Sequence, residues 1–213
     1  MLQSPFAFFR GAAAIMAADL AGEVRTGTEL VVCGDAHLAN FGLHASPDRR
    51  VLFDVNDFDE TAFGPWEWDV KRLAASAVVA GRHLGFTDTV SREAATRADR
   101  AYRRSLQRLF TWLTVDGRDY YCRQFRDMKG SIELEGLSPA QLVQYSALCG
   151  AVIARSHAQS PDAGVVSGYL GDSDRFDEAI ADWAAAYADQ TERDFAALEA
   201  AVADGHMPAE LGV

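Results

Sequence analysis

Val31-Val32-Cys33-Gly34-Asp35-Ala36-His37-Leu38-Ala39-Asn40 is the stretch around which the chain is organised, and Val51-Leu52-Phe53-Asp54-Val55-Asn56-Asp57-Phe58-Asp59-Glu60 repeats its form. Each stretch starts with a short apolar run that predicts a buried strand, and each ends in carboxylates and amides. Carboxylates that are packed closely repel one another, so they usually need a cation or a shared proton. The two polar tips therefore predict a single site for a metal ion and a phosphate.

The composition is that of an ordinary globular protein. The chain has 213 residues, of which 49% are hydrophobic and 24% charged, and we expect one domain over residues 1–213. The formal net charge is -11, whereas proteins that grip nucleic acid carry surplus Lys and Arg. The composition therefore argues against a nucleic-acid partner.

Cysteine usage and the first residues indicate a cytoplasmic protein. Cys33, Cys122 and Cys149 lie far apart and form no CxxC pair, which is typical of a reducing compartment and predicts neither a disulfide framework nor a zinc site. Residues 1–21 are apolar but contain two charged residues and no basic leader. They predict neither a signal peptide nor a membrane span.

Helices are predicted from capping signals and from the spacing of apolar residues. Ser4-Pro5 is a helix start, and the helix that follows is apolar nearly all round to about Leu20. The remaining helices are expected at Trp66 to about Leu84, Thr87 to about Trp112, Ser138-Pro139 to about His157, and about Phe176 to Ala203.

The two strand-and-tip units predict a hairpin, because Phe41-Gly42-Leu43-His44 and a turn at Ala45-Ser46-Pro47-Asp48 join them. The segment from Thr61 to Trp66 is expected to be a loop. Tyr120 to Met128 alternates loosely, which favours another strand. The predicted fold class is α+β, mostly helical, with a small β-hairpin that carries the site.

The spacing of the polar residues suits phosphoryl transfer. In kinase-type chemistry a loop Asp accepts the proton of the attacking hydroxyl, and an Asn and an Asp from nearby loops hold magnesium. Asp35, Asn40 and Asp54 have this order and spacing. Magnesium prefers hard oxygen ligands and takes few from the protein, which fits one amide and one or two carboxylates. His37 is expected to orient Asp35 or to contact a phosphate, and a purely structural His is the alternative.

Several basic residues are candidates for neutralising a phosphate or binding a substrate. Arg10 lies in the apolar first helix, where it either finds an anionic partner or extends to the surface. Lys71, Arg123 and Lys129 are the other candidates. Asp69 lies near a helix start, where a carboxylate is favourable by itself, so ordinary helix chemistry accounts for it.

Gly34-Asp35-Ala36-His37-Leu38-Ala39-Asn40 resembles the catalytic loop of aminoglycoside phosphotransferases and related small-molecule kinases, and Phe53-Asp54 is similar to their metal-binding Asp. The resemblance implies the catalytic lobe of a protein-kinase-like fold. It also implies Asp35 as catalytic base and Asn40 and Asp54 as ligands of Mg²⁺, with ATP as the phosphate donor. Asp57 or Asp59 would be supporting acids, and Asp57 competes with Asp54 for the metal.

Most of the chain also resembles the bacterial family called domain of unknown function 2252. The matching strings are Ser4 to Gly11, the GDAHLANFG loop, Phe53 to Glu60, Gly64 to Arg72, Tyr120 to Lys129 and the helix from Cys149 to His157. Members of that family carry a glycine-rich segment and a lysine before the Tyr-Tyr-x-Arg-Gln stretch. No such string precedes Tyr120 here, so the nucleotide-clamping lobe is not recognisable.

Several readings of the same residues stay open. The first is a magnesium-dependent phosphotransferase that acts on a small molecule, either alone or with a partner chain or a second copy that supplies the absent lobe. The second is a non-catalytic remnant that binds but does not turn over. A metal-dependent phosphohydrolase that uses Asp57 and Asp59 in a two-metal site is a third. A polar hairpin held only by turn hydrogen bonds is the structural alternative.

Overall fold

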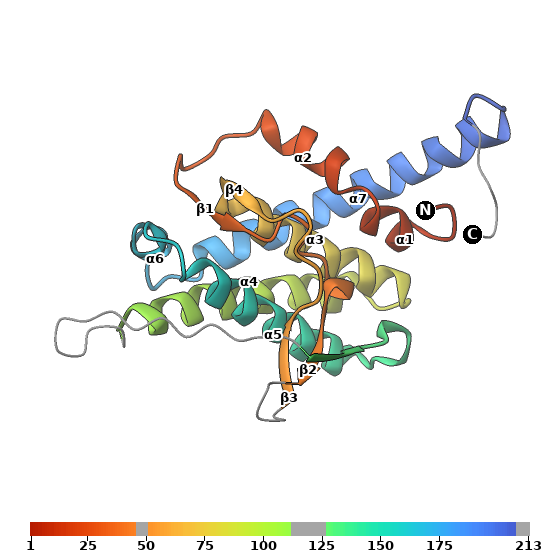
Figure 1. Cartoon of the computed structure of the whole chain (residues 1–213). Helices are drawn as coiled ribbons and strands as arrows, with labels where there is room; N and C mark the ends of the chain where they lie inside the picture. Colours follow the sequence, from red (N-terminus) through yellow and green to blue (C-terminus); the bar gives the residue numbers. More distant parts are fainter. Residues whose placement is uncertain (46–50, 112–126, 208–213) are drawn as a thin grey trace.

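A computed structural model of the chain describes residues 1–45, 51–111 and 127–207 (Figure 1). The fold is mostly helical α+β, as expected, with small antiparallel sheets. The long helices α3 (Trp66–His83), α4 (Asp88–Thr111), α5 (Pro139–His157) and α7 (Arg175–Ala203) pack against one another and form the bulk of the molecule. The strands lie along one side of this bundle (Figure 1).

The bundle helices form where the sequence predicts them, and their ends show why. Ser138 caps α5 by accepting a hydrogen bond from the backbone of Gln141, whose side chain in turn accepts one from the Ser138 amide. On α7 most of the buried residues are three or four positions apart, so one stripe of the helix faces the core. Trp66 at the start of α3 is fully buried and stacks on Tyr102 of α4.

The predicted first helix is wrong in its length, because the structure divides it into α1 (Pro5–Arg10) and α2 (Ala13–Ala21). The amide of Gly11 bonds back to the carbonyls of Phe8 and Phe9, which closes the first helix. A further helix, α6 (Ala163–Leu170), was not predicted. None of the helices within the described ranges is long and apolar enough to span a bilayer.

The predicted hairpin is wrong in its pairing. The first tip follows β1 (Glu29–Val32), whose partner is β4 (Ala62–Pro65), in the segment expected to be a loop. The second tip follows β3 (Val51–Val55), which pairs with β2 (Phe41–Ala45). On its other edge β2 pairs with β5 (Asp127–Ser131). The predicted strand at Tyr120 to Met128 lies outside the described residues except for Asp127 and Met128 of β5.

Candidate functional site

The strand pairing brings the two polar tips together by an indirect route. The first tip, loop 33–40, leaves β1 at Val32 and enters β2 at Phe41, through a short 3-10 turn, η1 (Leu38–Asn40). The second tip, loop 56–61, leaves β3 at Val55 and enters β4 at Ala62. Since Val32 pairs with Ala62 and Phe41 pairs with Val55, the loops begin and end beside each other.

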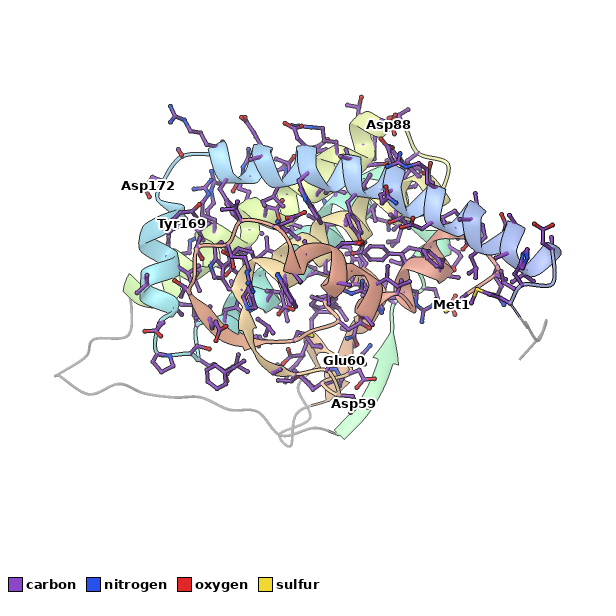
Figure 2. All side chains as sticks on the ribbon, turned by 90° about the horizontal axis from the view of Figure 1, so that it is seen from above. Met1, Asp59, Glu60, Asp88, Tyr169 and Asp172 are labelled. Carbon is purple, nitrogen blue, oxygen red and sulfur yellow. The ribbon has the colours of Figure 1, made fainter. Side chains whose placement is uncertain are left out.

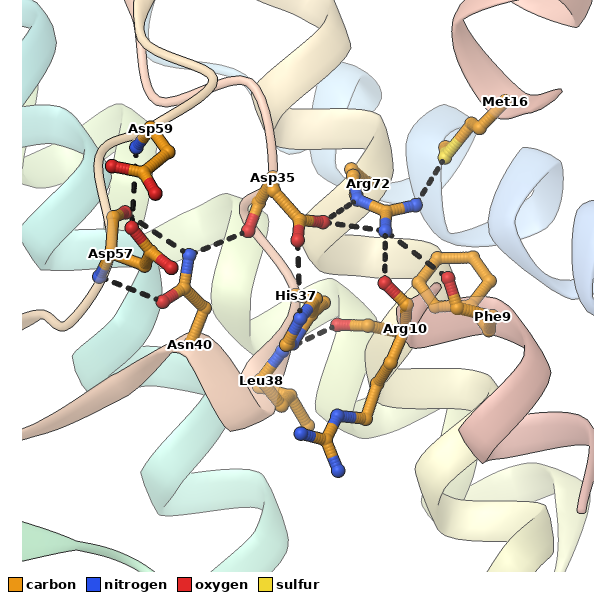
Figure 3. Close-up of polar contacts among 11 residues, drawn as sticks. Phe9, Arg10, Met16, Asp35, His37, Leu38, Asn40, Asp57, Asp59 and Arg72 are labelled. Carbon is orange, nitrogen blue, oxygen red and sulfur yellow. Dashed lines mark hydrogen bonds and ion pairs between the residues drawn. The ribbon is translucent and has the colours of Figure 1, made fainter. Parts of the chain in front are cut away.

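Asn40 joins the two loops through both ends of its side-chain amide (Figure 3). Its Nδ2 donates to the Asp35 carbonyl at 3.0 Å and lies 3.3 Å from the Asp57 carbonyl. Its Oδ1 accepts from the Asp57 amide at 3.0 Å. Because Asn40 is buried, water competes little for these bonds. One side chain therefore fixes the backbone of Asp35 relative to that of Asp57.

Gly34 allows a second close contact between the loops. Its φ is +84°, a left-handed conformation that side-chain-bearing residues rarely adopt. A Cβ placed on Gly34 would lie 2.8 Å from the Cβ of Glu60 and would also collide with the Glu60 carbonyl. The first loop can therefore lie against the second only with glycine at this position.

The Asp35 carboxylate is held on both sides (Figure 3). Nε and Nη2 of Arg72 lie 2.5 Å from its Oδ1, and Nε2 of His37 lies 3.4 Å from its Oδ2. Burial raises the pKa of Asp35, but the hydrogen bond from His37 and the nearby Arg72 charge outweigh it and leave the pKa below its ordinary value. Asp35 is therefore a fixed, ionised carboxylate.

Arg72 also fastens the N-terminal helices to this site. Its Nη2 donates to the carbonyls of Phe9 and Arg10 at 3.1 and 3.3 Å, and its guanidinium lies over the Phe9 ring. The sequence allowed a buried arginine in the first helix to pair with an acid. In the structure the buried arginine that pairs with an acid is Arg72 of α3, which contacts Asp35. Arg10, the arginine of the first helix, is exposed.

Helical side chains hold the backbone of the first loop along its length. Asp69 of α3 accepts from the amides of Cys33 and Gly34 at 2.6 and 2.9 Å. Ser76 Oγ accepts from the Leu38 amide at 3.1 Å. Tyr145 of α5 donates to the Leu38 carbonyl at 2.8 Å. The bundle therefore holds the loop in addition to the turn hydrogen bonds within it, such as that from the His37 amide to the Asp35 carbonyl.

Sequence reasoning missed Arg72 and Ser76 and assigned Asp69 to helix chemistry alone. The signal was nevertheless present, because Asp69, Arg72 and Ser76 are three and then four positions apart. That spacing places them on one face of a helix. Val70 and Leu73 beside them are buried in the core. In the sequence the polar residues therefore stand within the apolar pattern of a buried helix face.

The predicted metal-binding acids are not all together. Asp57 and Asp59 are exposed on the second loop, and the Asp59 amide donates to Asp57 Oδ1 at 3.2 Å. Figure 2 shows Asp59 and Glu60 at the edge of the molecule away from α7. Asp54 lies on β3, where Nη2 of Arg155 is 2.9 Å from its Oδ2. Within the described ranges, no group of three His, Cys, Asp or Glu side chains is arranged to hold a metal ion.

The predicted phosphate-binding residues are scattered. Lys71 forms an ion pair with Glu23 and lies over the Trp183 ring, so it is committed to the contact between Glu23 and Trp183 of α7. Arg123 lies outside the described residues. Lys129 is part of β5, where its backbone pairs with His44. Arg10 stays at the surface beside the first loop, with its carbonyl bound to Arg72.

Comparison with known families gives a match over most of the chain. Residues 1–112 and 105–201 match the model of a family described as uncharacterized protein conserved in bacteria (DUF2252). No curated protein matches the chain, and no solved structure matches it.

Proposed function

The chain belongs to the bacterial family DUF2252, and from the geometry of its acidic loops we propose that it is a magnesium-dependent phosphotransferase acting on a small molecule. The contact that carries the proposal is the one made by Asn40. Asn40 Nδ2 donates to the Asp35 carbonyl at 3.0 Å, and Asn40 Oδ1 accepts from the Asp57 amide at 3.0 Å. The side chain thereby links Asp35 on one loop to Asp57 on the next. Phosphoryl transfer is catalysed largely by positioning, so a rigid link between the base and a metal-binding acid is the feature it needs.

Asp35 is the proposed base that accepts the proton of the substrate hydroxyl. Arg72 and His37 hold its carboxylate in one orientation, and its lowered pKa keeps it ionised at neutral pH. A carboxylate held this way contributes more by orienting the hydroxyl than by strong basicity.

Asp57 and Asp59 are the proposed magnesium ligands, with the Asn40 amide oxygen beside them. Their exposed carboxylates are hard oxygen donors on one loop. Magnesium in proteins keeps several waters and binds one or two carboxylates together with substrate phosphates, so this donor set fits it. When bound, the ion would neutralise charge on the transferred phosphate. The structure favours Asp57 over Asp54, because Asp57 adjoins Asn40 and Asp54 is paired with Arg155.

A non-catalytic binding protein is the second candidate, and a specific observation favours it. Both oxygens of Asp35 are already engaged, one by Arg72 at 2.5 Å and the other by His37 at 3.4 Å. A base must leave an oxygen for the incoming hydroxyl. Transfer therefore requires the longer contact, from His37, to give way when a substrate binds.

The proposal is tested with ATP, Mg²⁺ and a panel of small hydroxylated and amino-bearing acceptors. We expect Mg²⁺-dependent phosphate transfer that falls by about 10³-fold or more in Asp35→Asn, because the amide cannot accept the proton. Asp182→Asn, an acid-to-amide change at an exposed ion pair with Arg92, is the matched control and should leave transfer unchanged.

Calorimetry with ATP and Mg²⁺ separates the two candidates. Asp35→Asn should still bind the nucleotide, since the substitution removes the base and not the ligands of the metal. Equal turnover in Asp35→Asn and the native chain would exclude Asp35 as the base. Absence of nucleotide binding and transfer by the native chain would favour the non-catalytic reading.

A further inference from the structure

A buried chain of polar side chains runs from the middle of the bundle to the start of the first loop. Tyr102 Oη on α4 lies 2.9 Å from Nδ1 of His157, the last residue of α5. His157 Nε2 lies 3.1 Å from Asp69 Oδ2 on α3. Asp69 then accepts from the amides of Cys33 and Gly34. The three side chains are at most 1% exposed, so they form a continuous hydrogen-bonded chain that excludes solvent.

The groups at the two ends of this chain determine which atoms donate and which accept along it. Asp69 accepts two backbone amides, so its carboxylate is the acceptor toward His157 and the Nε2 of that histidine carries a proton. In a neutral imidazole Nδ1 is then the acceptor, and the Tyr102 hydroxyl donates to it. Burial together with the charges of Asp69 and Glu67 raises the pKa of Tyr102, which keeps this hydroxyl protonated. Each polar atom in the chain therefore has at least one partner of the correct kind.

We propose that Tyr102 and His157 are positioning residues for the loop that carries Asp35. They fix the orientation of the Asp69 carboxylate, which accepts hydrogen bonds from the backbone of that loop. The proposal rests on the proposed function, since it assigns what holds the base of that site. An aspartate, a histidine and a hydroxyl in series also occur in hydrolytic triads, but here all three are buried and no substrate can reach the hydroxyl. The arrangement therefore acts through the loop and not on a substrate.

The physical reason for such a chain is the freedom of a carboxylate. Asp69 must present Oδ2 to Cys33 and Oδ1 to Gly34 at the same time, which fixes its side-chain torsions. Two backbone amides alone leave the rest of Oδ2 unsatisfied, and an unsatisfied buried charge is costly. His157 supplies the third bond, and Tyr102 fixes the tautomer and ring orientation of His157. Because Tyr102 also stacks on Trp66, the loop takes its position from the packing of α3, α4 and α5.

Tyr102→Phe tests the proposal in the full chain, because it removes only the hydroxyl and keeps the ring. We expect the amides of Cys33 and Gly34 to exchange their hydrogens about tenfold faster, as for the weakening of one buried hydrogen bond. The Val31 amide, which donates to Ser160 instead, is the internal reference and should not change. Phosphate transfer should lose kcat while KM for ATP stays the same, because the base and not the nucleotide is displaced.

Tyr187→Phe is the matched control, since it removes a tyrosine hydrogen bond to Asp19 and leaves the chain from Tyr102 through His157 to Asp69 intact. It should leave the exchange of Cys33 and Gly34 unchanged. His157→Gln keeps a donor toward Asp69 and should fall between the native chain and Tyr102→Phe in loop exchange. Equal exchange of the two amides in Tyr102→Phe and Tyr187→Phe, or equal acceleration of Val31, would overturn the proposal. An inactive native chain whose loop amides still respond to Tyr102→Phe would refute the phosphotransferase and leave the positioning role standing.

Discussion

At the scale of single residues, the acids of the second tip differ in what they already bind. Asp54 is held by Arg155 at 2.9 Å and by the Val55 amide, so both of its oxygens are engaged. Asp57 is exposed, and its backbone is fixed by Asn40. The sequence could not separate these two, because both follow the same apolar strand. The structure distinguishes their surroundings, because Asp54 on β3 is paired with Arg155 of α5.

This difference predicts different outcomes for two matched substitutions. Asp57→Asn should lower the apparent affinity for Mg²⁺ in phosphate transfer by more than about tenfold, because it removes the charge of a proposed ligand. Asp54→Asn should change that affinity by less than about threefold and cost under about 1 kcal/mol of stability, since its partly exposed ion pair with Arg155 contributes little. A Mg²⁺ titration of both variants measures the effect. The assignment is wrong if Asp54→Asn proves the more damaging.

At the scale of secondary structure, helices were predictable and strand partners were not. The helix at Pro139–His157 was predictable because Ser138-Pro139 is a helix-start signal, and such a signal consists of neighbouring residues. The residues of a strand that is four or five residues long do not indicate which strand it pairs with. The predicted hairpin therefore gave β1 the wrong partner, whereas its partner in the structure is β4. The meeting of the two tips was nevertheless predicted, because carboxylates at two strand ends implied a shared site. Its supports on α3 were missed, since Arg72 and Asp69 act across long sequence separations.

The close approach of the two loops gives a prediction at the same scale. Gly34→Ala should destabilise the protein by about 2 kcal/mol or more, because it combines a strained left-handed backbone with a collision against Glu60. Gly27→Ala is the control, since Gly27 has a φ of +82° but nothing within 4 Å of an added Cβ. That variant should cost only about 1 kcal/mol for the backbone.

Urea unfolding of both variants measures the difference, and Mg²⁺-dependent transfer should fall only in Gly34→Ala. Equal losses of stability in the two variants would mean that the loops do not depend on their contact. An active Gly34→Ala variant would mean that Asp35 and Asp57 need not be held at this separation.

At the scale of the whole molecule, a buried acid without a partner among the described residues lies outside the proposed site. Asp99 of α4 is fully buried, and neither of its carboxylate oxygens has a hydrogen-bond partner within the described part of the chain. Asp177 of α7 is also buried, but Arg103 pairs with it at 2.7 and 2.9 Å. Burial, and after it the charge of Asp177, raises the pKa of Asp99 well above its ordinary value. Folding therefore takes up a proton that the unfolded chain releases.

The sign of the resulting pH dependence follows from that proton. Between the ordinary pKa of an aspartate and the raised value in the folded state, the native protein binds more protons than the unfolded chain, so the contribution of Asp99 to stability falls as the pH rises. The limit for one proton is about 1.4 kcal/mol per pH unit. Asp99→Asn replaces the neutral acid with a neutral amide of similar shape, so it should remove this fall. The free energy of unfolding in urea at pH 5 and pH 8 measures it, with the exposed Asp182→Asn expected to follow the native chain. A pH dependence that is the same in Asp99→Asn and the native chain would show that Asp99 is ionised in the folded protein.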